Sequence, residues 1–153
     1  MEVALLPANY GRSPAALAEV DGGAGPAPAE TSRLLLVEDD YIVGMELEAG
    51  LSDAGFDVIA VVGTASEAIR LAAADRPKLI VMDIGLAGRR DGIDAAIEIY
   101  KTTGIRCIFA TAFGDGAMQA RAKPAAPVAW LPKPYSVDAL IAAVRTALGE
   151  PNR

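Results

Sequence analysis

The sequence contains no histidine among its 153 residues, and this absence excludes several kinds of chemistry. Without an imidazole, the chain cannot build a Ser-His catalytic triad or a His-ligated metal site, and it cannot carry a phosphoryl group on histidine. Its one cysteine, Cys107, lies inside an apolar run, which favours a packing role in a reducing compartment. No run approaches 18 apolar residues, and the N-terminus lacks the basic start of a secretory signal. We therefore expect a cytoplasmic protein with no membrane partner.

Basic residues are also few, with 14 Lys and Arg against 20 Asp and Glu, which gives a net charge of −6. They are scattered along the chain, so no basic cluster exists that would follow a phosphate backbone. We therefore expect no nucleic-acid partner. The apolar content of 52% indicates a globular domain with a real core.

Large apolar side chains are scarce in residues 1–32, where half of the positions are Ala, Gly or Pro. Such a composition cannot offset the entropy cost of ordering the chain, so we predict a disordered leader there. The regular pattern of a folded domain starts at Arg33 and continues to Gly149, and residues 150–153 form a short tail. The expected organisation is one domain with a leader.

Apolar runs alternate five times with amphipathic segments between residues 33 and 149. This (βα)5 order predicts an α/β fold with helices on both faces of a parallel sheet. We expect the flavodoxin-like, doubly wound strand order 2-1-3-4-5, whose ligand crevice lies between the first and third strands. The expected strands are 34–37, 57–62, 79–83, 106–110 and 128–131, and the expected helices are 41–54, 65–76, 92–103, 115–122 and 137–148.

Carboxylates follow two of these strands at the edge where parallel strands place their ligands. Glu38 and Asp39 come directly after the first strand, and Asp83 ends the third. Each close pair of such charges costs about 1–4 kcal/mol in a medium between water and a protein surface. A cation would neutralise this cluster, and all-oxygen ligands suit Mg²⁺. The alternatives are a solvated acidic rim and an Asp83 that merely begins a turn.

Two further side chains stand at the same edge. Thr111 follows the fourth strand with a hydroxyl, and Lys133 follows the fifth with an ammonium group that can bind a phosphoryl oxygen. A carboxylate nucleophile, a Mg²⁺ site, an ammonium and a hydroxyl are together what phosphoryl transfer to an Asp requires. Taken separately, Thr111 is an ordinary strand residue and Lys133 an ordinary surface charge.

Residues 33–149 resemble the receiver domain of two-component response regulators on four motifs, each at a strand end. These are Leu36-Val37-Glu38-Asp39-Asp40, Val81-Met82-Asp83, Phe109-Ala110-Thr111-Ala112 and Leu131-Pro132-Lys133-Pro134. The sequence departs from the family in the loop Gly85-Leu86-Ala87-Gly88, where a Pro-containing turn is commoner. It also departs at Trp130, where the family usually has Tyr or Phe.

The resemblance implies a role for each of these residues. Asp83 would be the phosphoacceptor, with Lys133 and Thr111 binding the phosphoryl group. Mg²⁺ would be held by Asp39, by Glu38 through water, by Asp83 and by the backbone carbonyl of Gly85. Thr111 and Trp130 would form the conformational switch, and the Lys133–Pro134 bond would be cis.

The resemblance also implies a single-domain response regulator, because only four residues follow Gly149. A histidine kinase or a histidine phosphotransfer protein would supply the phosphoryl group. Output would be binding of a downstream protein at the surface made by the fourth helix, fifth strand and fifth helix, or onward transfer in a phosphorelay. Such a protein, a monomer or weak dimer, would catalyse only its own phosphoryl transfer and autodephosphorylation.

One alternative function uses related chemistry. Phosphohydrolases with an Asp nucleophile carry Asp-x-Asp on the nucleophile strand, and the second Asp is their general acid. In this chain the second position after Asp83 is Gly85, which offers no acid. The sequence therefore favours the receiver over the hydrolase.

Overall fold

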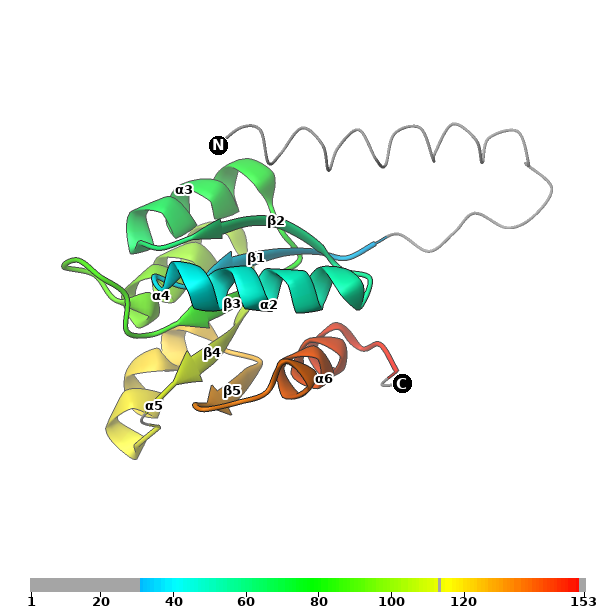
Figure 1. Ribbon diagram of the computed structural model, residues 1–153. Coiled ribbons are helices and arrows are strands. Elements are labelled where there is room, and N and C mark those ends of the chain that lie inside the picture. Colours follow the sequence, from blue (N-terminus) through cyan, green and yellow to red (C-terminus); the bar gives the residue numbers. More distant parts are fainter. Residues whose placement is uncertain (1–30, 113, 152–153) are drawn as a thin grey trace. The chain divides into compact units, whose positions relative to one another are not determined.

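The computed structural model describes residues 31–112 and 114–151, so the predicted leader lies outside the described residues except for its last two positions. Five parallel strands form one sheet in the order β2-β1-β3-β4-β5, which confirms the predicted fold class (Figure 1). The strands are β1 Arg33–Val37, β2 Asp57–Val62, β3 Leu79–Asp83, β4 Cys107–Thr111 and β5 Ala129–Pro132.

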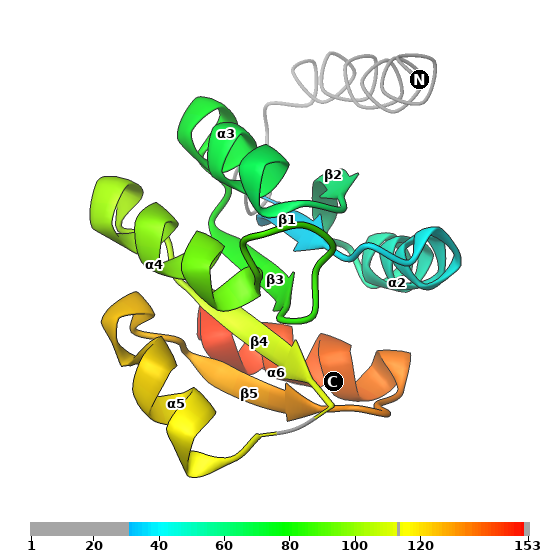
Figure 2. The same ribbon diagram turned by 90° about the vertical axis from the view of Figure 1, so that its left-hand side faces the viewer.

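Helices cover both faces of this sheet, as the alternating pattern predicts. They are α2 Tyr41–Asp53, α3 Ala65–Asp75, α4 Gly92–Thr103, α5 Gly116–Ala122, the short 3-10 helix η1 Lys123–Ala125 and α6 Val137–Leu148. Figure 2 shows α2 and α6 on one face and α3, α4 and α5 on the other. No helix in the described ranges has the length and apolar character needed to cross a bilayer.

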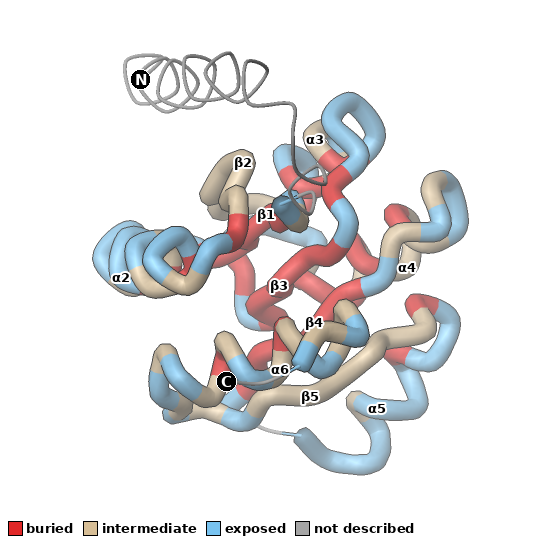
Figure 3. Tube along the Cα trace, turned by 90° about the vertical axis from the view of Figure 1, so that its right-hand side faces the viewer, coloured by how far each residue is buried: buried red, intermediate tan, exposed pale blue. Residues whose placement is uncertain are grey.

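The core consists of two apolar layers, one on each side of the sheet. The central strands β1, β3 and β4 are buried along most of their length, because apolar residues on both faces contact helices (Figure 3). Leu35, Met82 and Phe109 point toward α3, α4 and α5, and Leu36, Val81 and Ile108 point toward α2 and α6. This double burial makes the strand ends a rigid base for the polar residues that follow them.

The predicted helix starts are confirmed by side-chain caps. The Asp40 carboxylate accepts hydrogen bonds from the N–H groups of Ile42 and Val43 at the start of α2, and Ser136 caps α6. Asp91 and Asp94 form a reciprocal capping box at α4. The predicted box at α3 is incomplete, because Glu67 accepts from the Thr64 hydroxyl and from the Gly63 N–H instead of from the Thr64 N–H.

The structure corrects the predicted inner face of α4. Ile93 and Ala96 are buried as expected, whereas Ile97 and Tyr100 are only partly buried and Ile99 is buried in their place. The cause is the packing of Gly92 against the backbone that follows β3. The inward stripe of the helix therefore runs through the positions three, four and seven residues after Gly92.

The strand register places the predicted site residues, except Trp130, at one edge of the sheet. Val37 pairs with Met82, Asp83 with Ala110, and Thr111 with Pro132, so β1, β3, β4 and β5 end at a common level. The structure starts β4 and β5 one residue later than the sequence predicts. This shift leaves Thr111 as the last residue of β4 and Lys133 as the first residue after β5.

Candidate functional site

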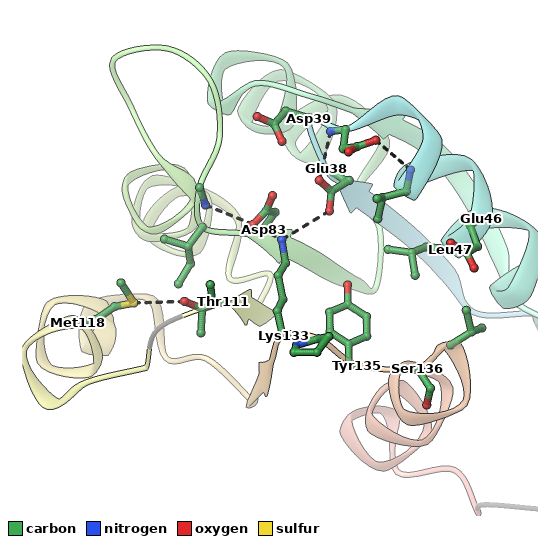
Figure 4. A pocket seen from close by; sticks show the side chains of 17 residues that line it. Glu38, Asp39, Glu46, Leu47, Asp83, Thr111, Met118, Lys133, Tyr135 and Ser136 are labelled. Carbon is green, nitrogen blue, oxygen red and sulfur yellow. Dashed lines mark hydrogen bonds and ion pairs between the residues drawn. The ribbon is translucent and has the colours of Figure 1, made fainter.

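A pocket of about 1100 Å³ opens at the carboxyl edge of β1, β3 and β4. Its polar side is made by the residues that end or follow these strands, and its apolar side lies between α2 and the segment that leads from β5 into α6 (Figure 4). The predicted residues Glu38, Asp39, Asp83, Gly85, Thr111 and Lys133 all line it. The structure thus brings together six of the seven predicted site residues.

Three carboxylates share the polar side of the pocket. Glu38, Asp39 and Asp83 each offer an oxygen within 4.8 Å of the others. Glu38 and Asp83 are buried, whereas Asp39 is exposed at the rim. Burial makes the mutual repulsion of these groups more costly than it is on an open surface. The donor set is all oxygen and partly open to solvent, which fits Mg²⁺ with some of its waters retained.

Lys133 lies between two of these carboxylates. Its Nζ is 3.1 Å from Oδ1 of Asp83 and 4.0 Å from Oε1 of Glu38. The Gly85 N–H donates to the same Oδ1 of Asp83 at 3.2 Å. Asp83 is therefore held in a fixed orientation by a cation on one side and by the backbone of the next loop on the other.

The surroundings of Glu38 shift the pKa of its carboxyl. Burial raises its pKa to about 7, and the negative charge of Asp83 adds to the effect. The Asp40 N–H, which donates to Oε2 of Glu38 at 3.1 Å, and the positive charge of Lys133 act in the opposite direction. Because burial outweighs these opposing effects, Glu38 takes up a proton more readily than an exposed carboxyl does.

Thr111 is buried at the end of β4, and its hydroxyl donates a hydrogen bond to Sδ of Met118 at 3.6 Å. Met118 belongs to α5 and also lines the pocket (Figure 4). Sequence reasoning did not find Met118, because an apolar residue in a short Ala-rich helix carries no chemical signal. Only the fold shows that it lies next to the predicted switch threonine.

Gly92 and Tyr135 are two further residues that the sequence analysis missed. A Cβ at Gly92 would collide with the carbonyl oxygen of Asp83, so α4 begins directly against the backbone of the predicted phosphoacceptor. The Tyr135 hydroxyl points toward the polar side of the pocket (Figure 4). Burial and the charges of Glu38 and Asp83 raise the pKa of Tyr135 to about 12, so the phenol stays protonated at neutral pH.

Trp130 is the predicted site residue that does not line the pocket. It is partly buried on the α5 side of the sheet, beside its strand partner Phe109, with ring centroids 5.0 Å apart. Because side chains alternate along a strand, Trp130 and Thr111 lie on the same side of the sheet. The Lys133–Pro134 bond is cis, as the resemblance implies.

Comparisons with known proteins give consistent results. The model of the response regulator receiver domain family matches residues 34–145. The transcriptional regulatory protein PdtaR of Mycobacterium tuberculosis is 36% identical over 116 residues, which are 76% of this chain and 56% of that protein. The phyllosphere-induced regulator PhyR of Methylorubrum extorquens is 36% identical over 112 residues, which are 72% of this chain and 42% of that protein.

A solved structure shares the fold. The signal receiver domain of the modulated diguanylate cyclase from Desulfovibrio desulfuricans G20 has a TM-score of 0.71 and 31% identity, and the match covers 78% of this chain and 95% of that one. This chain spans about half the length of the curated relatives it matches.

Proposed function

The chain belongs to the family of response regulator receiver domains, and from this premise we propose that Asp83 accepts a phosphoryl group from a phosphohistidine. The observation that supports the proposal best is the position of Asp83. Its Oδ1 lies 3.1 Å from Lys133 Nζ, in the same pocket as Glu38 and Asp39. A buried carboxylate beside a cation and a second acidic pair suits a nucleophile better than a structural ion pair.

The proposed reaction is a transfer between two proteins. A carboxylate oxygen of Asp83 forms a bond to phosphorus, the P–N bond of the donor phosphohistidine breaks, and the electron pair leaves with the imidazole. The ammonium of Lys133 stabilises the charge on the phosphoryl oxygens, and the Thr111 hydroxyl donates a hydrogen bond to one of them once it turns toward Asp83. These groups act by position and charge, which is how proteins catalyse phosphoryl transfer in general.

Receiver domains bind Mg²⁺ through acidic residues, and Glu38, Asp39 and Asp83 form such a cluster in this chain. The proposed ligands are Asp39, Asp83 and the Gly85 carbonyl, with Glu38 acting through water. Bound there, Mg²⁺ would neutralise the carboxylates and the incoming phosphoryl oxygens.

Receiver domains are signalling proteins and not classical enzymes, and they generally take phosphoryl groups from histidine kinases or phosphotransfer proteins. We propose that this domain catalyses only its own phosphorylation and autodephosphorylation. Its output is the phosphorylation-dependent binding of a downstream protein at the surface of α5, β5 and α6, or onward transfer of the phosphoryl group. PdtaR and PhyR are both regulators by name, which supports a regulatory output.

The proposal is tested by intact-mass spectrometry after treatment with acetyl phosphate. We expect one added phosphoryl group in the presence of Mg²⁺, little with EDTA, and none in Asp83→Asn. Asp53→Asn, which removes an exposed carboxylate at the end of α2, is the matched control and should be labelled like the wild type. Equal labelling of Asp83→Asn and wild type would overturn the assignment.

A further inference from the structure

The hydrogen bond between Thr111 and Met118 joins the predicted switch residue to a helix that the proposed chemistry does not use. The Thr111 hydroxyl donates to the thioether of Met118, with 3.6 Å between Oγ1 and Sδ. Both side chains line the same pocket as Asp83, and Thr111 is buried (Figure 4). The contact therefore lies beside the place where the phosphoryl group is proposed to form.

A hydroxyl has one proton and can donate it to one acceptor at a time. If Thr111 donates to Met118, it cannot donate to a phosphoryl oxygen on Asp83, so the two hydrogen bonds exclude one another. Thioether sulfur is a weak acceptor, whereas hydrogen bonds to charged oxygens are roughly twice as strong as neutral ones. The Met118 bond is thus weak enough to be replaced by a hydrogen bond to a phosphoryl oxygen.

The position of Met118 is fixed by the anchoring of α5 at both ends. Asp115 caps the helix by accepting from the Met118 N–H at 2.8 Å. One turn later, the Arg121 guanidinium binds both carboxylate oxygens of Asp91 at 2.8 and 2.9 Å and Asp94 at 3.0 Å. Asp91 caps α4, the helix that packs against the backbone of Asp83. The thioether therefore reaches Thr111 from a helix that is tied to α4, and α4 packs against the backbone of Asp83.

From these contacts we propose that Met118 is a positioning residue for Thr111. Its thioether holds the Thr111 hydroxyl on the α5 side of β4 in the unphosphorylated protein, and thereby sets how readily Thr111 engages the phosphoryl group. This inference rests on the proposed function of Asp83 and deepens it. Met118 touches neither Asp83 nor the phosphoryl group in this role and acts only through the hydroxyl.

The test is a double-mutant cycle on the affinity for beryllofluoride with Mg²⁺, a mimic of the phosphoryl group on Asp83, measured by ¹⁹F NMR. Met118→Leu keeps the side-chain volume and removes the acceptor. We expect this change to tighten beryllofluoride binding about two- to fivefold, the equivalent of one weak neutral hydrogen bond. In the Thr111→Ala background the same change should have no effect, because no hydroxyl remains to be held. Met45→Leu on α2 is the matched control, and its affinity should equal that of wild type.

Two outcomes would overturn the inference while leaving the proposed function standing. In the first, beryllofluoride binding is lost in Asp83→Asn, but Met118→Leu binds beryllofluoride with the same affinity as the wild type or more weakly. The other is an equal change in both backgrounds, which would show that Met118 acts by packing. Failure of the wild type to bind, or binding unaffected by Asp83→Asn, would overturn the proposed function itself and this inference with it.

Discussion

Lys133 is the one basic side chain among the described residues that line the pocket. Its ammonium partly neutralises Asp83 and Glu38 and would repel a divalent cation held by the same carboxylates. We therefore expect Lys133→Met to tighten Mg²⁺ binding, by roughly three- to tenfold at an intermediate dielectric. The same change should slow phosphorylation by acetyl phosphate, because a positive charge on the phosphoryl oxygens is lost.

Isothermal titration with Mg²⁺ and a phosphorylation time course check these two effects, which have opposite signs. Weaker Mg²⁺ binding in Lys133→Met would mean that Lys133 positions the carboxylates more than it competes with the cation. An unchanged phosphorylation rate in Lys133→Met would show that Lys133 takes no part in the proposed phosphoryl transfer.

The glycines at positions 85 and 92 allow a matched comparison. A Cβ at Gly85 meets nothing within 4 Å, whereas one at Gly92 collides with the Asp83 carbonyl oxygen. We expect Gly85→Asn to fold like the wild type and to change the autodephosphorylation rate, because residue 85 borders Asp83. Gly92→Ala should lower the free energy of unfolding by about 1–3 kcal/mol, the usual cost of overpacking.

Urea unfolding and the decay of phosphorylated protein check these two variants. A free energy of unfolding for Gly92→Ala equal to that of the wild type would show that α4 can shift to accept the added Cβ without loss of stability. A wild-type decay rate for Gly85→Asn would show that this position does not border the phosphoryl group.

The residues that the sequence identified are those whose chemistry and spacing are visible without a fold. Asp83, Glu38 and Lys133 are charged and follow apolar runs, so strand topology alone predicts that they meet. Met118 and Tyr135 line the same pocket but carry no such signal. Met118 belongs to a helix with little apolar periodicity, and its relation to Thr111 depends on the docking of α5. Sequence reasoning finds charges at strand ends and misses neutral neighbours that only packing brings close.

At the scale of elements, the ion pair between Arg121 and Asp91 ties α5 to the N-terminus of α4. Burial alone would raise the pKa of Asp91, but the hydrogen bonds from Arg121 and from the Asp94 N–H outweigh burial and lower it below its ordinary value of 3.8. A carboxyl whose pKa is lower in the folded state stabilises the fold above its unfolded pKa. That stabilisation is lost as the pH falls through the lower folded value.

We therefore expect Asp91→Asn to melt at a lower temperature than wild type at pH 7. The difference should shrink at pH values below about 3.8. Asn still caps a helix, so the comparison isolates the charge. Thermal melts at both pH values measure the effect, with Asp53→Asn as the control for removing a carboxylate elsewhere. A difference that is the same at both pH values would show that the loss of stability does not come from the ion pair.

The order and type of the elements were predictable because each has a local signal. Apolar runs between polar breaks give the strands, and Asp40, Asp91 and Ser136 mark helix starts. The inner face of α4 was not fully predictable, since Ile97, Ile99 and Tyr100 are all apolar enough to be buried. The contact of Gly92 with the end of β3 decides among them, and that contact is a tertiary property.

At the scale of the whole molecule, the folded domain contains both apolar layers and the pocket, which is lined in part by residues of α2, α5 and α6. The leader predicted from composition has few large apolar groups to bury. We therefore expect a chain that starts at Thr31 to melt within about two degrees of the full chain, since little apolar area would be lost.

Differential scanning calorimetry of the two chains checks this expectation, and beryllofluoride binding should also be equal in both. A fall of many degrees would show that residues 1–30 contribute to the stability of the domain or of an assembly.

The central claim is that Asp83 carries the phosphoryl group, and chemical trapping of the modified residue tests it most directly. The protein is treated with acetyl phosphate and Mg²⁺, reduced with borohydride, digested and sequenced by tandem mass spectrometry. Reduction converts an aspartyl phosphate to homoserine, so we expect homoserine at position 83 and at no other Asp. Homoserine at Asp39 or at another carboxylate, with Asp83 unmodified, would contradict it.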